Sequence, residues 1–168
     1  ILLFGSLILL SVLKFTNPLG LNKKANFWMG MFLLLWSSYW MEEIAMLTKN
    51  SEPEFYVSFI VHYIQFFTPI CFYISVLYYT NPNFRFRKIN LVWLILPFLF
   101  LINHLILNFG TGAKKSLFEA TYLIIILIQL LIYSIASYIK IRKHQKKIQF
   151  IYSNTKDLNL NWLEYIIT

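Results

Sequence analysis

The stretch LFEATYLIIILIQLLIYSIASYIKIRKHQKK, residues 117–147, decides the fold of this chain. Its first part, 117–139, is almost continuously apolar and exceeds the roughly 20 residues that a helix needs to cross a bilayer. In a soluble protein its centre would be typical of a buried strand, but its length favours a helix. The basic residues that follow at once are typical of a spanning helix that ends at the cytoplasmic surface.

Other apolar runs accompany this one, at residues 1–13, 27–47, 55–79 and 91–109. Strands standing alone in lipid would leave backbone groups unpaired, so each run is expected to be a helix. The run 1–13 is too short to span a bilayer, and residues 162–168 resemble the beginning of another helix. We therefore expect an all-α, polytopic transmembrane helix bundle with five spanning helices, the first truncated, and the start of a sixth. The chain is expected to be a fragment.

The composition agrees with a membrane protein. Hydrophobic residues make up 58% of the chain and charged residues 13%, with a mean hydropathy of +0.60. Soluble proteins carry about 25% charged residues. The single cysteine, Cys71, excludes an intrachain disulfide framework and a cysteine-based zinc cluster.

The basic residues alternate from loop to loop along the chain. Of the 15 Lys and Arg residues, 12 fall near residues 14–24, 85–88 and 140–156, whereas Lys49, Lys114 and Lys115 occupy the other two loops. Short cytoplasmic loops carry the excess of Lys and Arg. The N-terminal end is therefore expected outside and segment 140–161 in the cytoplasm.

Several polar side chains fall inside the expected spans, where they are costly and begin as functional candidates. The candidate ligand pocket, on the outer side of the midplane, contains Glu42, Glu43, His62, Gln65, Asn103, His104 and Gln129. Three interpretations stay open: hydrogen bonds between helices, a pocket for a small molecule or ion, and a metal site built from Glu42 or Glu43 with His62 and His104. The metal site is the least favoured, so no metal or cofactor is assigned.

Helical spacing adds detail to these candidates. His62, Gln65 and Pro69 share one face of their helix, and Tyr122 and Gln129 share a face of another. Both faces are expected to point into the bundle. Pro69 and Pro97 each free a backbone carbonyl near mid-membrane, which is expected to open a kink or a small cavity. Tyr122 also falls where an outer interfacial belt of aromatic residues is expected.

The basic end of the 117–147 stretch has a simpler interpretation. Anionic lipid attracts basic residues near the membrane surface by about 1 kcal/mol each. The predicted lipid-surface and topology anchors are Lys140, Arg142, Lys143, Lys146 and Lys147.

The C-terminal part carries a family resemblance. The basic stretch His144-Gln145-Lys146-Lys147, the turn Tyr152-Ser153-Asn154 and the stretch 157–163 (DLNLNWL) resemble the loop before the sixth helix of membrane-embedded AraC-family regulators of Bacteroidetes-type bacteria. The resemblance implies a seven-helix sensor region in the inner (cytoplasmic) membrane of a bacterium, followed by a cytoplasmic helix-turn-helix domain. These 168 residues contain no such DNA-binding motif. No residue here is therefore assigned to DNA binding.

The expected function is the membrane sensor, or signal-input region, of a bacterial transcriptional regulator, with no catalytic residues. Related sensor regions on histidine kinases or LytTR-type regulators are an alternative, as is a small transporter or integral membrane enzyme. The expected partners are the lipid bilayer and a small-molecule or ion signal, with a second copy of the chain as a further candidate. DNA would be reached only through a domain absent from these residues.

Overall fold

The computed structural model describes residues 2–49, 55–110, 115–151 and 160–167, and every regular element within them is helical. The all-α class predicted from the sequence is thus confirmed. The elements are α1 (Leu2–Thr16), α2 (Lys23–Ser37), η1 (Ser38–Trp40), α3 (Met41–Lys49), α4 (Phe55–Gln65), α5 (Phe67–Thr80), η2 (Lys88–Leu94), α6 (Ile95–Gly110), α7 (Lys115–Ile151) and α8 (Asn161–Ile167).

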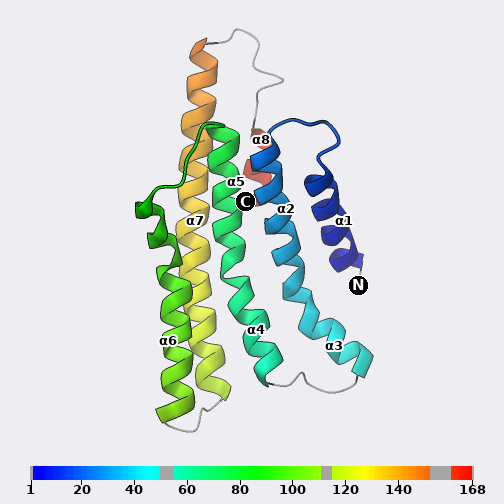
Figure 1. Cartoon of the computed structure of the whole chain (residues 1–168), viewed down its shortest axis with the longest axis vertical. Helices are drawn as coiled ribbons and strands as arrows, with labels where there is room; N and C mark the ends of the chain where they lie inside the picture. Colours follow the sequence, from blue (N-terminus) through cyan, green and yellow to red (C-terminus); the bar gives the residue numbers. More distant parts are fainter. Residues whose placement is uncertain (1, 50–54, 111–114, 152–159, 168) are drawn as a thin grey trace.

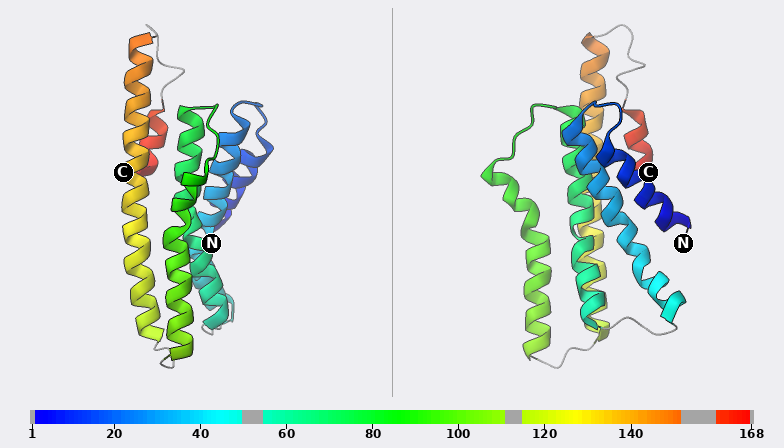
Figure 2. Two further views of the ribbon diagram at one scale, coloured as in Figure 1. Left: turned by 60° about the vertical axis from the view of Figure 1, so that its left-hand side comes forward. Right: turned by 45° about the vertical axis from the view of Figure 1, so that its right-hand side comes forward.

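The long helices lie side by side as an elongated bundle (Figure 1; Figure 2). Helix α2 packs between α1 and α5, α5 packs in turn against α7, and α6 covers another side of α7. The short helix α8 returns to the bundle, where Leu163 is buried in the same core cluster as Phe32, Phe72 and Ile141. The centre of the bundle is therefore α5.

Small residues let α1 and α2 approach closely. The buried Ser11 hydroxyl donates a hydrogen bond to the carbonyl oxygen of Gly30 at 2.9 Å. A Cβ added at Gly30 would lie 2.9 Å from the Phe15 ring. Small residues serve this purpose in membrane helix pairs, where close backbone contact replaces the hydrophobic effect.

The run 27–47, predicted as one helix, is interrupted. α2 ends at Ser37, and one 3-10 turn, η1, leads into α3. The hydroxyls of Ser37 and Ser38 donate to the carbonyl oxygens of Leu34 and Leu35, each at 2.6 Å. Serine hydroxyls that bond backbone carbonyls slightly destabilise and often bend helices. Both serines lie where α2 gives way to η1.

The run 91–109 also begins differently from the prediction. Residues Lys88–Leu94 form the 3-10 helix η2, and the α-helix starts only at Ile95. Pro97 consequently lies in the first turn of α6, where its missing N–H costs little. The kink predicted at Pro97 is thus replaced by a change from 3-10 to α-helix just before it.

Helix α7 is longer than the run that predicted it. It continues through the basic segment to Ile151, for 37 residues, or about 55 Å. The hydrocarbon core of a bilayer is roughly 30 Å thick. The basic part of α7 extends beyond the other helices in Figure 1, so the first half of segment 140–161 is a helical extension.

Two helices of the described residues are long and apolar enough to cross a membrane, Phe59–Thr80 and Ala120–Ile148. The sequence predicted five spanning segments. Leu2–Thr16 and Lys88–Asn103 are apolar but shorter, and the interruption at η1 divides the run 27–47. The structure thus gives a helical bundle with two candidate membrane-spanning helices by length and composition.

Candidate functional site

The candidate site is built around a break between α4 and α5. Pro69 has no N–H to offer the carbonyl of Gln65, and its ring would clash with that carbonyl in a regular helix. The α-helix accordingly stops at Gln65 and resumes at Phe67. At the break, the Phe66 N–H bonds the carbonyl of Tyr63, three residues back, at 3.3 Å. The kink predicted at Pro69 is confirmed.

Two side chains of α7 bind this break directly. The amide nitrogen of Gln129 donates to the carbonyl oxygen of Phe66 at 2.8 Å. The Tyr122 hydroxyl donates to the side-chain oxygen of Gln65. All four residues are buried. Helix α7 is therefore tied to the break by two hydrogen bonds that lie two helical turns apart.

Aromatic rings enclose these polar groups. Phe66, Phe100, Tyr122 and Ile126 form one buried core cluster. The His62 ring meets the Tyr122 ring edge to face, with centroids 4.2 Å apart. We call His62, Gln65, Phe66, Tyr122 and Gln129 the break cluster.

The break cluster contains no Asp, Glu, Lys or Arg. A phenol, two amides and an imidazole suit hydrogen bonding to neutral groups. Among the described residues, the buried side-chain oxygen of Gln129 has no hydrogen-bond partner. It is therefore free to accept from a small molecule or from a rearranged side chain. Buried acceptors without a partner are few in native proteins, because leaving them unpaired is costly.

The structure brings together three of the seven predicted pocket residues, His62, Gln65 and Gln129. Asn103 lies nearby on α6, where its amide donates to the Thr121 hydroxyl on α7 at 3.1 Å. Glu43 has an exposed side chain on α3, whereas the helices that build the break cluster are α4, α5 and α7. The side chains of Glu42 and His104 lie outside the described residues. Among the side chains that are described, no group of three His, Cys, Asp or Glu is arranged to hold a metal ion.

Tyr122 belongs to the core, where its side chain is 6% exposed. The helical face that it shares with Gln129 predicted this bundle-facing position. The second prediction for Tyr122, a place in an outer interfacial belt, is wrong. The partner that the sequence interpretation missed is the backbone carbonyl of Phe66. The only indication of it in the sequence is that Phe66 directly follows Gln65, the residue four positions before Pro69.

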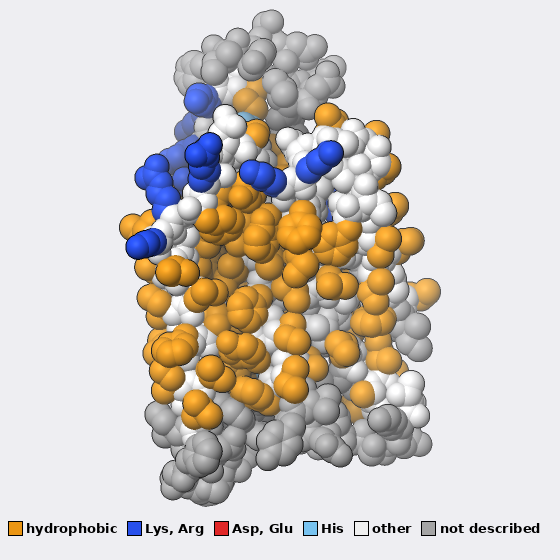
Figure 3. All heavy atoms as spheres, viewed as in Figure 1, with side chains coloured by type: hydrophobic (Ala, Val, Ile, Leu, Met, Phe, Trp, Pro, Cys, Tyr) orange, Lys and Arg blue, Asp and Glu red, His pale blue; other side chains and the backbone are white. Residues whose placement is uncertain are grey.

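The Lys and Arg residues whose side chains the structure describes gather at the end of the molecule opposite α3. Figure 3 shows Lys and Arg side chains at one end of the visible face and a broad hydrophobic band beside them. Among the predicted anchors, Arg142 donates to the Tyr138 hydroxyl at 3.0 Å, and Lys140, Lys143, Lys146 and Lys147 are exposed. At the same end Lys14 lies over the Trp162 ring and Lys24 over the Tyr78 ring.

The fold and the site thus define a helical protein with candidate membrane-spanning helices and a buried polar cluster at a helix break. No family model, curated protein or solved structure matches this chain.

Proposed function

We propose that the chain is the signal-input region of a multi-pass protein of the bacterial inner membrane. Its helical runs cross the bilayer five times, with the interruption at η1 inside one crossing. The N-terminal end faces outward and the basic extension of α7 faces the cytoplasm. The support for a lipid surface is the row of exposed apolar side chains along α7, which are Leu123, Ile124, Leu127, Ile128, Leu131, Ile132 and Ile135.

The observation that carries the signalling proposal is the attachment of α7 to the α4–α5 break. Hinge motions are absorbed by a few residues at the ends of elements or in short connections, and the α4–α5 break is such a place. Gln129 and Tyr122 connect such a break to one continuous helix that reaches Ile151. A change in the bend between α4 and α5 therefore moves or rotates the basic end of α7.

A signal molecule shifts the equilibrium between two bend angles of α4 and α5 only if it binds the two conformations with different affinities. In our proposal a small molecule or ion near the break cluster favours one bend, and α7 conveys the difference to the cytoplasm. The output is a DNA-binding domain of AraC type in another part of the protein, a proposal that rests on the resemblance of residues 140–163. A histidine kinase or LytTR-type output would use the same input.

The test compares variants of the natural gene in its own bacterium. Gln129→Leu removes the hydrogen bond to the carbonyl oxygen of Phe66. Leu127→Ala is the control, because Leu127 lies two residues away on the same helix and its side chain is exposed. Both proteins should be present in the membrane at the level of the parent. Only Gln129→Leu is expected to change the transcript profile of the cell. Unchanged transcripts in a correctly inserted Gln129→Leu variant would contradict the signalling proposal.

A further inference from the structure

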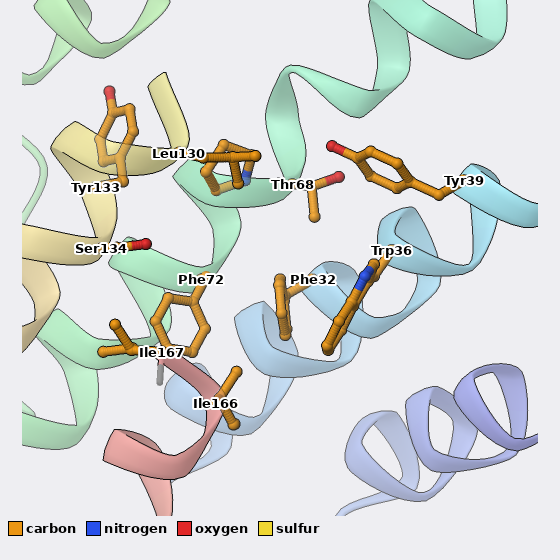
Figure 4. Close-up of a pocket in the computed structure, with 11 residues that line it drawn as sticks. Phe32, Trp36, Tyr39, Thr68, Phe72, Leu130, Tyr133, Ser134, Ile166 and Ile167 are labelled. Carbon is orange, nitrogen blue, oxygen red and sulfur yellow. The ribbon is translucent and has the colours of Figure 1, made fainter. Parts of the chain in front are cut away.

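The molecule contains an apolar cavity in the bundle and two grooves at its basic end. The cavity, of about 190 Å³, lies between α2 with η1, α5, α7 and α8, and Pro69 lines it. The hydroxyls of Tyr39 and Thr68 face each other beside it (Figure 4). None of the described residues that line the cavity is charged, so it selects no class of ligand. The two grooves have a more specific chemistry.

The two grooves flank one pair of exposed lysines, Lys23 and Lys24, in the first turn of α2. The larger groove, of about 610 Å³, lies between the end of α1, the connection 17–22 and the start of α2, and we call it the α1–α2 groove. The smaller groove, of about 150 Å³, lies between the start of α2 and the residues Tyr78 and Pro82 at the end of α5. Both lysines line both grooves, so an occupant of either groove meets two positive charges.

Hydrogen bonds hold the wall of the α1–α2 groove in place. The Asn26 amide donates to the side-chain oxygen of Asn17 at 2.8 Å and to the Leu21 carbonyl at 2.9 Å. The Asn17 amide donates to the same carbonyl at 3.0 Å. The Tyr79 hydroxyl of α5 donates in turn to the side-chain oxygen of Asn26. The groove is therefore part of the packed bundle, and its two lysines project from a defined backbone.

The α1–α2 groove also has an aromatic side. Phe15, Phe27 and Trp28 line it together with the two lysines. The ring centroids lie 5.7 Å apart between Phe15 and Phe27, and 5.8 Å apart between Phe27 and Trp28. Leu19 and Leu21 in the same connection are exposed. Charged groups and apolar surface thus adjoin within one groove.

This combination selects an anionic amphiphile. No Asp or Glu is among the described residues that line either groove, so the lysine charges favour an anion. A free phosphate would use the lysines and leave the aromatic side uncovered. A zwitterionic lipid would bring its own cation close to the lysines. Basic pockets between helices on the cytoplasmic side of a membrane bind acidic lipid headgroups.

We infer that the α1–α2 groove is a binding site for one anionic phospholipid. The lipid phosphate binds Lys23 and Lys24, and the glycerol and the first part of the acyl chains cover Phe15, Phe27 and Trp28. The site differs from the general attraction between the basic end of α7 and a lipid surface, because it needs a groove of defined shape. The inference rests on the proposed function for the placement of the chain in a membrane.

The test uses the full chain in a neutral detergent and native mass spectrometry, which counts bound lipid molecules. Phosphatidylglycerol and phosphatidylcholine with the same acyl chains are added in equal amounts. We expect one bound phosphatidylglycerol, at least about 5-fold more often than phosphatidylcholine. Glycerol 3-phosphate carries a phosphate without acyl chains, and it is expected neither to bind at the same concentration nor to displace the lipid. Because the protein is in detergent, the result does not depend on how many times the chain crosses a membrane.

A double substitution locates the site. Lys23→Gln with Lys24→Gln removes both charges from the groove and keeps much of the length of each side chain. The preference for phosphatidylglycerol is expected to fall by about 5-fold or more. Arg85→Gln with Lys88→Gln is the control, because it makes the same change in net charge at exposed positions that line neither groove. The control should keep the preference of the parent.

Three outcomes would overturn the inference. The first is equal binding of the two lipids by the parent protein. The second is displacement of phosphatidylglycerol by glycerol 3-phosphate, which would make the groove a site for free phosphate. The third is an equal loss of preference in the groove variant and its control, which would leave only a general attraction to the basic end. Thermal unfolding in the same detergent shows that each variant is folded before lipid is added.

Discussion

Tyr122 is the residue through which α7 meets the side chain of Gln65. Its hydroxyl is the donor to a buried amide oxygen, and Tyr122→Phe removes that donor while leaving the ring. Because the Gln65 oxygen is then left unpaired, we expect the free energy of unfolding to fall by about 1–3 kcal/mol. Unfolding of the purified protein by SDS in mixed micelles measures the change.

The matched control is Tyr138→Phe, since Tyr138 is exposed and its hydroxyl only accepts from the exposed Arg142. Its unfolding curve should stay close to that of the parent. If the two substitutions destabilise the protein equally, the buried hydrogen bond to Gln65 is not a main support of the break cluster.

Gly30 is the second position where a single residue controls packing. A Cβ there would lie 2.9 Å from the Phe15 ring and 3.2 Å from the Ser11 carbonyl oxygen, and a longer side chain would force α1 from α2. We expect Gly30→Leu to lower the midpoint temperature of unfolding by several degrees. Gly5→Leu is the control, because nothing lies within 4 Å of a Cβ at Gly5. Similar behaviour of the two variants would refute the close α1–α2 contact.

Among the elements, the α4–α5 pair has the clearest mechanical role. Pro69→Ala supplies the N–H that the Gln65 carbonyl lacks and removes the clash that breaks the helix. The variant is expected to straighten the helix and lengthen the distance across it. Spin labels at Ile60→Cys and Asn83→Cys, both exposed positions, report this distance by pulsed electron resonance in a Cys71→Ala background. Identical distance distributions with proline and alanine would show that Pro69 does not cause the break.

The same elements show what the sequence could and could not predict. Apolar length predicted the helical class, and the rule for Pro69 predicted its kink. The interruption lies at Ser37 and Ser38, whose hydroxyls bond carbonyls of their own helix, a feature that apolar periodicity does not register. The extension of α7 to Ile151 was missed because its basic residues were taken as the end of a span, although they are good helix formers.

Only part of the candidate site could be predicted, because periodicity gives the faces of single helices and not how the helices pack. Periodicity gave the correct face of α4 for His62 and Gln65, and of α7 for Gln129. It could not give the rotation of one helix against another, which the packing of α5 against α7 decides. The expected grouping of Glu43 with these residues therefore failed, since α3 turns away after η1 and leaves Glu43 exposed.

At the scale of the whole molecule, the distribution of charge and apolar surface supports one orientation in a bilayer. Basic side chains occupy one end, and a hydrophobic band covers much of the face beside them (Figure 3). We propose that the chain crosses the membrane five times, with residues 81–88 in the cytoplasm and residues 111–114 outside. If only Phe59–Thr80 and Ala120–Ile148 crossed, these two loops would lie on the same side.

The most direct measurement is therefore the labelling of single cysteines in intact cells with a thiol reagent that does not cross the inner membrane. Asn83→Cys and Gly112→Cys are made separately in a Cys71→Ala background. We expect Gly112→Cys to react in intact cells and Asn83→Cys to react only after the cells are lysed. If both positions react under the same condition, the five crossings are wrong, and with them the function that we propose.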